Sequence, residues 1–233
     1  MILERKATNN ISDLRKQYGA FMEKLQINAP DKPGVTLLDI AALIQVYNGA
    51  MKTISAKLEV LDDEFQISHN HNPIHHLECR IKGIQSIYEK IRRYDVPFTL
   101  ESVREYIQDI AGIRVICNFI DDIYVMESLL VQQPDITVVK RKNYIEQPKQ
   151  NGYRSLHLVV KVPVFLSGRT ENVPVEIQLR TIAMDYWASL EHMLRYKNSK
   201  TDMKQYFAML LDCANSLADT EKTMQKIRMG IEN

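Results

Sequence analysis

The pattern of apolar and polar positions changes abruptly at residue 181. Through 173–180 the two kinds of residue alternate, which predicts a strand, and through 181–197 they follow a helical period. The polar face of this strand carries Glu176, Gln178 and Arg180. The helix that follows carries Asp185 on its own polar face. A polar strand face that runs into a polar helix face can form one wall of a site for a polar ligand, although a solvated sheet edge gives the same pattern.

Elsewhere the same periodicities predict an α/β (α+β) protein in which helices surround a small mixed β-sheet. The expected strands are 110–119, 135–142, 154–163 and 173–180. The last two are separated by the turn-forming segment 167–172, which predicts a hairpin. The expected helices of this core are 83–93, 99–106, 121–132 and 181–197. The order of the strands in the sheet does not follow from the pattern.

Long helices are expected on both sides of this core. One covers 11–27, and the next, at 37–65, carries a heptad stripe of Ile40, Tyr47, Ile54 and Leu61, with Leu58 among the residues between. The C-terminal helix carries a similar stripe of Met203, Leu210, Leu217 and Met224. Such stripes either pack on a sheet or join copies of a chain, and the pattern leaves both open. We therefore expect a helical region at 1–75, an α/β core at 76–198 and an oligomerisation helix at 199–233.

The composition is that of a soluble globular protein, with 45% hydrophobic and 25% charged residues in a chain of 233. A formal net charge of +1 argues against a protein that coats nucleic acid, so any anion site must be a local cluster. The three cysteines show no C-x-x-C spacing, which fits a reducing compartment. No apolar run approaches the roughly 20 residues of a membrane span. We therefore expect a cytoplasmic protein without membrane contact.

The densest positive charge lies at 80–93, where five residues are basic and one is acidic. On a helix, Ser86, Lys90 and Arg93 share one face, opposite a row of isoleucines. This face could hold a polyphosphate, or it could simply be solvated. The usual phosphate loops, Walker A and G-x-G-x-x-G, do not occur in the chain.

Two further segments could contribute to the same site. Asp109 opens an apolar strand that Arg114 interrupts, so Asp109 could bind Mg²⁺ beside phosphates or could pair with Arg114. Lys149, Tyr153 and His157 lie around a turn and a strand start, and could form a purine cradle or an ordinary exposed face. The basic segment 140–142 just upstream is interpreted as a surface patch that does not contact the ligand.

Four histidines, His69, His71, His75 and His76, lie close together in the sequence. Their spacing matches no zinc pattern and no cysteine pair accompanies them, so we interpret them as surface or structural residues. No nucleophile elbow occurs either, and covalent catalysis is not indicated.

In their order along the chain, these segments resemble the synthetase domain of the RelA/SpoT family. The motifs are R-I-K-G-x-x-S-I-x-x-K-x-x-R, D-I-A-G-I-R, K-x-x-G-Y-R-S-x-H and V-E-I-Q-L-R-T-x-A-M-D-x-W-A-S-L-E-H, between Arg80 and Tyr196. More narrowly, the chain is similar to the stand-alone small alarmone synthetases, which are GTP pyrophosphokinases with a nucleotidyltransferase-like fold. The lead-in 72–76 and the long N-terminal helix are closer to the RelP branch than to the RelQ branch.

The resemblance implies transfer of the pyrophosphoryl group of ATP to the 3′-hydroxyl of GDP or GTP, giving ppGpp or pppGpp in the stringent response. It implies that Arg80 and Arg114 sandwich adenine, while the ATP phosphates contact Lys82, Ser86, Lys90 and Arg93. Asp109 and Glu176 would bind Mg²⁺, and Glu176 would also activate the 3′-hydroxyl. The residues assigned to GDP or GTP are Lys149, Tyr153, His157, Gln178 and Asp185. Asp185 departs from the RelQ branch, which has Asn there, so the recognition of guanine stays open.

Other functions stay open beside this one. The same fold could serve as a non-catalytic module that binds guanine nucleotides or RNA, although such a module does not need both Asp109 and Glu176. A nucleotidyltransferase with another acceptor is less favoured, because the G-S and D-x-D pattern of that class is not visible. No His-Asp doublet occurs, so we expect synthesis without hydrolysis. The resemblance also implies a homotetramer, in which Ile54 and Leu58 are candidate interface residues; RNA binding is not indicated.

Overall fold

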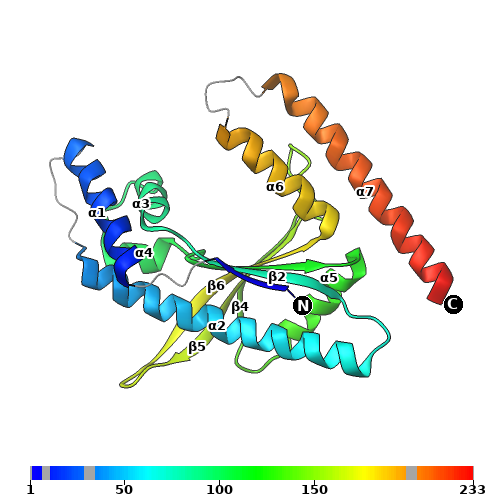
Figure 1. Ribbon diagram of the computed structural model, residues 1–233, viewed down its shortest axis with the longest axis horizontal. Coiled ribbons are helices and arrows are strands. Elements are labelled where there is room, and N and C mark those ends of the chain that lie inside the picture. Colours follow the sequence, from blue (N-terminus) through cyan, green and yellow to red (C-terminus); the bar gives the residue numbers. More distant parts are fainter. Residues whose placement is uncertain (1, 7–10, 29–34, 198–203, 233) are drawn as a thin grey trace.

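A mixed β-sheet forms the centre of the molecule (Figure 1), and the computed structural model describes residues 2–6, 11–28, 35–197 and 204–232. The strands are β1 (Ile2–Lys6), β2 (Ile74–Ile81), β3 (Ala111–Cys117), β4 (Thr137–Asn143), β5 (Leu156–Phe165) and β6 (Thr170–Thr181). Their order across the sheet is β1-β2-β3-β6-β5-β4. The pairs β1–β2 and β3–β6 are parallel, and the other neighbours are antiparallel. The predicted mixed sheet and the β5–β6 hairpin are confirmed.

The helices are α1 (Ile11–Asn28), α2 (Leu37–Ser68), α3 (Ile84–Arg93), α4 (Leu100–Tyr106), α5 (Ile120–Val131), α6 (Ile182–Lys197) and α7 (Lys204–Glu232). All seven lie within a few residues of the predicted ranges. At the start of two of them, side chains cap the free backbone N–H groups. Thr36 and Asp39 form a reciprocal capping box at the start of α2, and Thr99 caps α4.

Strand β2 is absent from the sequence prediction, because its apolar positions do not alternate. A β-bulge shifts the register between Ile74 and His76 in the pairing with β3, so that Ile74 and Leu77 are both buried although three positions apart. Strand β1, at the edge beside β2, was also not predicted. The division of the chain into regions 1–75, 76–198 and 199–233 stays a prediction.

Helix α2 runs along one face of the sheet (Figure 1) and shares the main hydrophobic core with α5. Its heptad stripe packs inside this core, where Ile54 and Leu58 are each 0% exposed. The expectation that these two residues form an interface between copies is therefore wrong, because their side chains are already covered within one chain. No described helix is both long and apolar enough to cross a membrane.

Helix α7 lies beside α6 on the other side of the molecule (Figure 1). One face of α7 packs on α6 through a small cluster of Trp187, Ala188 and Ala214, with Leu210 and Leu217 at its margin. The indole Nε1 of Trp187 donates a hydrogen bond to the carbonyl oxygen of Leu210, at 2.9 Å. Met203, the first residue of the predicted stripe, lies outside the described residues.

Candidate active site

Strand pairing gathers the polar side chains into two adjacent rows across the face of the sheet opposite α2. The first row is Glu78, Arg114, Gln178, His157 and Lys142. The second row is Arg80, Gly112, Glu176, Val159 and Lys140. Because directly paired residues point to the same face of a sheet, the side chains from these five strands form one continuous surface.

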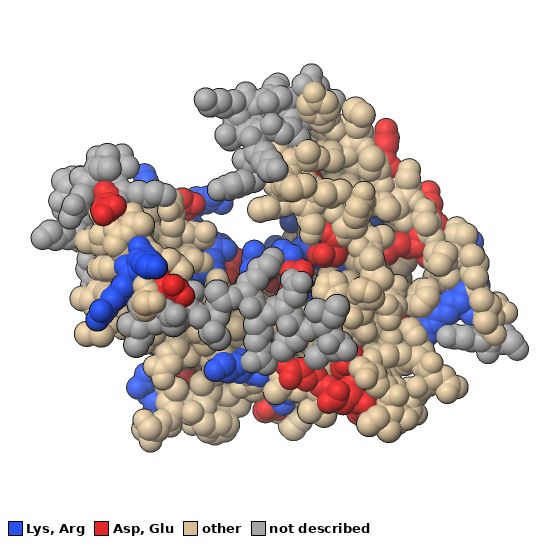
Figure 2. Space-filling view, in the orientation of Figure 1, with Lys and Arg blue, Asp and Glu red and all other residues tan. Residues whose placement is uncertain are grey.

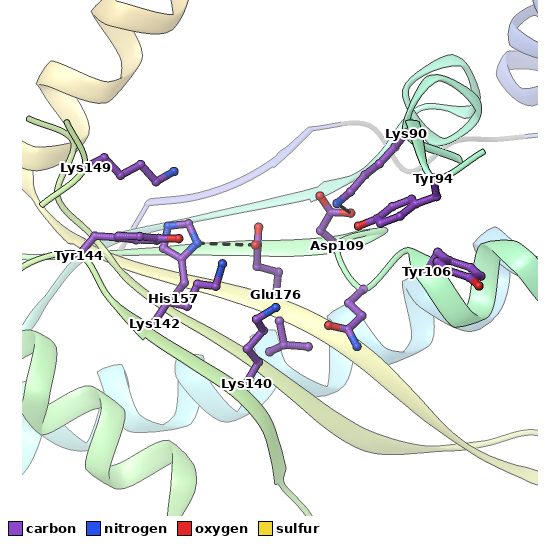
Figure 3. A pocket seen from close by; sticks show the side chains of 12 residues that line it. Lys90, Tyr94, Tyr106, Asp109, Lys140, Lys142, Tyr144, Lys149, His157 and Glu176 are labelled. Atoms are coloured by element: carbon purple, nitrogen blue, oxygen red, sulfur yellow. Dashed lines mark ion pairs between the residues drawn. The ribbon is translucent and has the colours of Figure 1, made fainter. Parts of the chain in front are cut away.

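Two cavities open over these rows, in a hollow whose floor carries several Lys and Arg side chains (Figure 2). The larger has a volume of about 320 Å³, and its lining includes Lys90, Lys149 and His157 (Figure 3). The smaller has a volume of about 80 Å³, and its lining includes Arg80, Arg114 and Gln178. Asp109 and Glu176 line both cavities. The two carboxylates therefore lie at the boundary between the larger cavity, lined by lysines and His157, and the smaller cavity, lined by two arginines and Gln178.

Asp109 lies just before β3 and forms ion pairs with two lysines. Its carboxylate oxygens are 2.9 Å from the Nζ atoms of Lys82 and Lys90. Burial by itself raises the pKa of Asp109, but the hydrogen bonds and charges of the lysines outweigh it and hold the pKa below its ordinary value. The alternative ion pair between Asp109 and Arg114 does not form.

Arg114 instead pairs with carboxylates on its own face of the sheet. Its Nη1 is 3.0 Å from Glu78 and 3.9 Å from Asp185. Burial, together with the charge of Arg180, lowers the pKa of Arg114 from its ordinary value. Arg80 is the strand partner of Gly112 in the adjacent row, so both arginines reach the smaller cavity from neighbouring strands. Their expected contact with adenine stays a prediction.

Glu176 extends from β6 between the two cavities. The Nε2 of Gln178 donates to its Oε2 at 2.7 Å, and the Nδ1 of His157 lies 3.6 Å from its Oε1. Burial raises the pKa of Glu176, but contact with His157 and Gln178 outweighs this, and the net pKa is lowered. Glu176 is therefore a carboxylate at neutral pH.

The loop before β5 brings Tyr144 and Lys149 to the larger cavity, while Tyr153 packs beside Lys149 without lining the cavity. The Nζ of Lys149 lies 4.7 Å from the centre of the Tyr144 ring and 4.6 Å from that of Tyr153. The Tyr153 hydroxyl lies 2.8 Å from His157 Nε2. Gly152 has φ +86°, a left-handed conformation that favours glycine. Tyr144, a lining residue, was missed by the sequence analysis, since it falls in a loop without periodicity.

The segment 140–142, interpreted as a surface patch, contributes two lysines to the lining of the candidate site. Lys140 and Lys142 both line the larger cavity (Figure 3), while Arg141 points away and pairs with Glu127 at 2.5 Å. The alternation of strand β4 explains the difference, because alternate residues face opposite sides of the sheet. The predicted strand at 135–142 already implied that Lys140 and Lys142 share one face and Arg141 lies on the other.

Helix α3 contributes one lysine directly to the site. Its Ile84, Ile87 and Ile91 are buried, as predicted, and Lys90 lines the larger cavity. Ser86 and Arg93 are exposed and line neither of the two cavities. Lys82 lies just before α3 and reaches the site through its ion pair with Asp109.

Arg180 was not among the predicted site residues, although the alternation of β6 put it on the site face. Its Nη1 is 2.8 Å from Asp185 Oδ1, and its Nη2 donates to the Tyr153 hydroxyl at 2.7 Å. Asp185, expected to bind the guanosine nucleotide, is thus already paired with an arginine. Tyr153 and Asp185, from separate segments, are brought together by this one side chain.

The four clustered histidines do not converge on a common point. His71 Nε2 is 2.9 Å from Asp122, which also accepts from Arg228 of α7 at 3.0 Å. His75 and His76 contact each other through their Nδ1 atoms, at 2.7 Å. Among the described residues, no group of three or more His, Cys, Asp or Glu side chains is arranged to hold a metal ion. The interpretation as surface or structural histidines stays a prediction.

Comparisons with known proteins agree on the family. Residues 79–201 match the model described as "Region found in RelA / SpoT proteins". The chain is 42% identical to the GTP pyrophosphokinase YwaC of Bacillus subtilis over 80% of its length and 89% of that protein. It is 37% identical to the GTP pyrophosphokinase YjbM of the same organism, over 80% of this chain and 87% of that one.

A solved structure extends the similarity to the fold. It is the small alarmone synthetase 1 of Bacillus subtilis bound to its product pppGpp, with a TM-score of 0.77 and 34% identity. The match covers 83% of this chain and 98% of that one. Sequence motifs, strand rows and three independent comparisons thus lead to one conclusion: the chain belongs to the RelA/SpoT family.

Proposed function

We propose that the protein transfers the pyrophosphoryl group of ATP to the 3′-hydroxyl of GDP or GTP. The observation that carries this proposal is that Asp109 and Glu176 line two adjoining cavities at once. A group transfer between two nucleotides requires both to meet at a point of charge stabilisation. The names of the relatives, both GTP pyrophosphokinases, support the same activity.

The smaller cavity is assigned to the base of ATP. The region around Lys82 and Lys90 is assigned to the ATP phosphates. The guanidinium planes of Arg80 and Arg114 can stack on both faces of adenine. Lys82 and Lys90 then turn from Asp109 toward the triphosphate, while Ser86 and Arg93, which line neither cavity, stay candidates for phosphate contacts.

The larger cavity is assigned to the acceptor. The ring of Tyr153 stacks on guanine, and Lys149 holds charge near the rings of Tyr144 and Tyr153. Lys140, Lys142 and His157 supply positive charge and hydrogen-bond donors to the 5′-phosphates. Gln178 and Asp185 stay candidates for contacts to the nucleosides.

Glu176 accepts the proton of the 3′-hydroxyl while the oxygen attacks the β-phosphorus of ATP. The new O–P bond forms as the bond between that phosphorus and the α,β-bridging oxygen breaks, and AMP leaves. Asp109 and Glu176 suit Mg²⁺, because both are held ionised and Mg²⁺ uses one or two carboxylates together with phosphate oxygens. When bound, Mg²⁺ supplies charge neutralisation at the transferring phosphates.

The test is incubation with γ-labelled ATP, Mg²⁺ and either GDP or GTP, followed by chromatography. Label should appear in a guanosine tetra- or pentaphosphate, and Glu176→Gln should lower the rate by about 10²–10⁴-fold, the contribution of a general base. Glu101→Gln, an exposed residue of α4, is the control and should keep full activity. Nucleotide binding without transfer to either acceptor by the wild type overturns the proposal in favour of a binding module.

We further propose that the active form is a homotetramer and that the enzyme makes alarmone without hydrolysing it. Exposed apolar residues on α7 support the assembly, since a lone chain would leave them in water; they include Met209, Met224, Ile227 and Ile231. The assignment to the RelP-like branch stays a prediction.

A further inference from the structure

Arg180 is the most buried cation of the site and contacts no cavity directly. Its side chain is 6% exposed, and it extends from β6 two residues beyond Gln178, next to the row that contains Gln178. The Nη1 of Arg180 pairs with Asp185, which balances its charge. Nη2 makes two further bonds, one to the Tyr153 hydroxyl at 2.7 Å and one to Gln178 Oε1 at 2.8 Å.

The bond to Tyr153 has a direction, because a guanidinium can only donate hydrogen bonds. The phenol oxygen of Tyr153 therefore accepts from Arg180, and its own proton is free to be donated to His157 Nε2, 2.8 Å away. A neutral imidazole that accepts at Nε2 carries its proton on Nδ1. That nitrogen is the one that lies 3.6 Å from Glu176 Oε1.

The bond to Gln178 has a direction for the same reason. The amide oxygen of Gln178 must point at the donor Arg180, so its Nε2 amide group points the other way. That group donates to Glu176 Oε2 at 2.7 Å. Two chains of contacts thus lead from one cation to the two oxygens of one carboxylate. The chain through Gln178 ends in a 2.7 Å hydrogen bond, and the chain through Tyr153 ends with the Nδ1 of His157 3.6 Å from Oε1.

We propose that Arg180 is a positioning residue that orients the donors around Glu176 through Tyr153–His157 and through Gln178. It acts through these neighbours and does not contact substrate. The inference rests on the proposed role of Glu176 in the transfer reaction. Its immediate consequence is that the tautomer of His157 in the ligand-free protein is set by a side chain two contacts away.

The decisive measurement is ¹⁵N NMR of the ligand-free protein with labelled histidine, at about pH 8.5 where an ordinary histidine is neutral. The chain has six histidines, and His157→Gln assigns the relevant pair of signals. The wild type should show a protonated Nδ1 and an unprotonated Nε2. Arg180→Gln should lose this preference, because the amide oxygen can accept the tyrosine proton. Arg180→Lys, which can only donate, should retain it.

Tyr153→Phe provides a second variant that leaves the buried arginine in place. It removes only the hydroxyl, so the Nε2 of His157 loses its proton donor and the Nδ1–H tautomer should no longer dominate. An unchanged Nδ1–H form in Tyr153→Phe and in folded Arg180→Gln overturns the proposal. So does a wild-type signal of Nε2–H or of doubly protonated imidazolium. If Arg180→Gln fails to fold, Tyr153→Phe and the wild type decide.

Kinetics separate positioning from a general loss of structure. Arg180→Gln should lower kcat by about 10- to 100-fold, the effect of losing a hydrogen bond to a charged group, while the KM for ATP stays unchanged. Arg180→Lys should recover part of kcat. Equal changes in kcat and in ATP binding would overturn the positioning role. Because the NMR readout needs no turnover, it remains valid even if the chain fails to transfer pyrophosphate.

Discussion

Asp109 is neutralised by Lys82 and Lys90 before any nucleotide binds. In the proposed reaction the triphosphate would exchange these ion pairs for contacts of its own, with the lysines moving to phosphate and the carboxylate becoming available to a metal ion. Such an exchange keeps opposite charges paired throughout, which limits the cost of leaving a half-buried charge uncompensated.

Asp109→Asn should abolish most of the activity and also change stability in a pH-dependent way. The pKa of Asp109 is lowered in the folded protein, so its ionised form stabilises the fold above the ordinary pKa of an aspartate, about 4. This contribution disappears as the pH falls through the lowered pKa. Thermal denaturation should therefore show a lower Tm for the variant at pH 7 and a shrinking difference toward pH 3.

The exposed Asp212→Asn on α7 is the control and should leave Tm unchanged over this range. A Tm difference for Asp109→Asn that is the same at every pH would contradict the lysine pairing described for Asp109.

At the scale of elements, helix α7 packs against the loop before β5, which carries Lys149 and Tyr153. The guanidinium of Arg154 donates to the carbonyl of Ala214 at 3.2 Å and to Asn215 Oδ1 at 3.1 Å. Gly152 lies so close to α7 that an added Cβ would meet the Ala214 Cβ at 2.5 Å. The loop that carries Lys149 and Tyr153 is therefore shaped by a helix far away in the sequence.

Gly152→Ala should disturb this contact and weaken acceptor binding. The substitution combines a positive φ with a clash against another Cβ, and should lower the free energy of unfolding by about 1–3 kcal/mol. The KM for GDP or GTP should rise while the KM for ATP changes little. Gly168→Ala, in the β5–β6 turn with nothing within 4 Å of the added Cβ, is the matched control. Equal effects at both glycines would argue against the close approach of α7.

Glu221 on the same helix gives a prediction of opposite sign. Burial raises its pKa, and it accepts a hydrogen bond from the Thr181 hydroxyl. The protonated form therefore stabilises the fold below the ordinary pKa of a glutamate, and this stability is lost as the pH rises through the raised pKa. Glu221→Gln keeps the acceptor without the charge, so it should raise Tm at pH 8 and have little effect near pH 4. A Tm gain at pH 4 as large as that at pH 8 would refute this account.

At the scale of the whole molecule, local patterns were predictable and long-range order was not. Strands β3, β4, β5 and β6 were predicted from their local patterns of apolar and polar residues, whereas the β-bulge hid β2. The candidate site was predicted as separate segments, since its two rows depend on a strand order that pairs residues far apart in sequence. The role of Arg180 depends on contacts with three segments, and no single segment could reveal it. The α2 stripe was ambiguous until its contacts were known.

The exposed face of α7 is where association between copies should be tested. Replacing Met224 and Ile227 together by Glu puts two charges at positions that are 51% and 50% exposed. If α7 joins copies, light scattering should show the mass of the assembly falling toward the 27.0 kDa of one chain, with an unchanged circular dichroism spectrum. Val60→Glu, 65% exposed on α2, is the control and should leave the mass unchanged. An unchanged mass in the double variant would remove this face from the interface.

The carboxylates shared by the two cavities have a consequence for inhibitor design. A compound that joins an adenine group to a guanine group across Asp109 and Glu176 binds as one molecule where substrates bind as two, so its second half associates at high effective concentration. Enzymes that bind only ATP or only GTP lack the adjoining cavity and retain just half of those contacts. Selectivity against this family can therefore come from the length and charge of the linker, more than from either base.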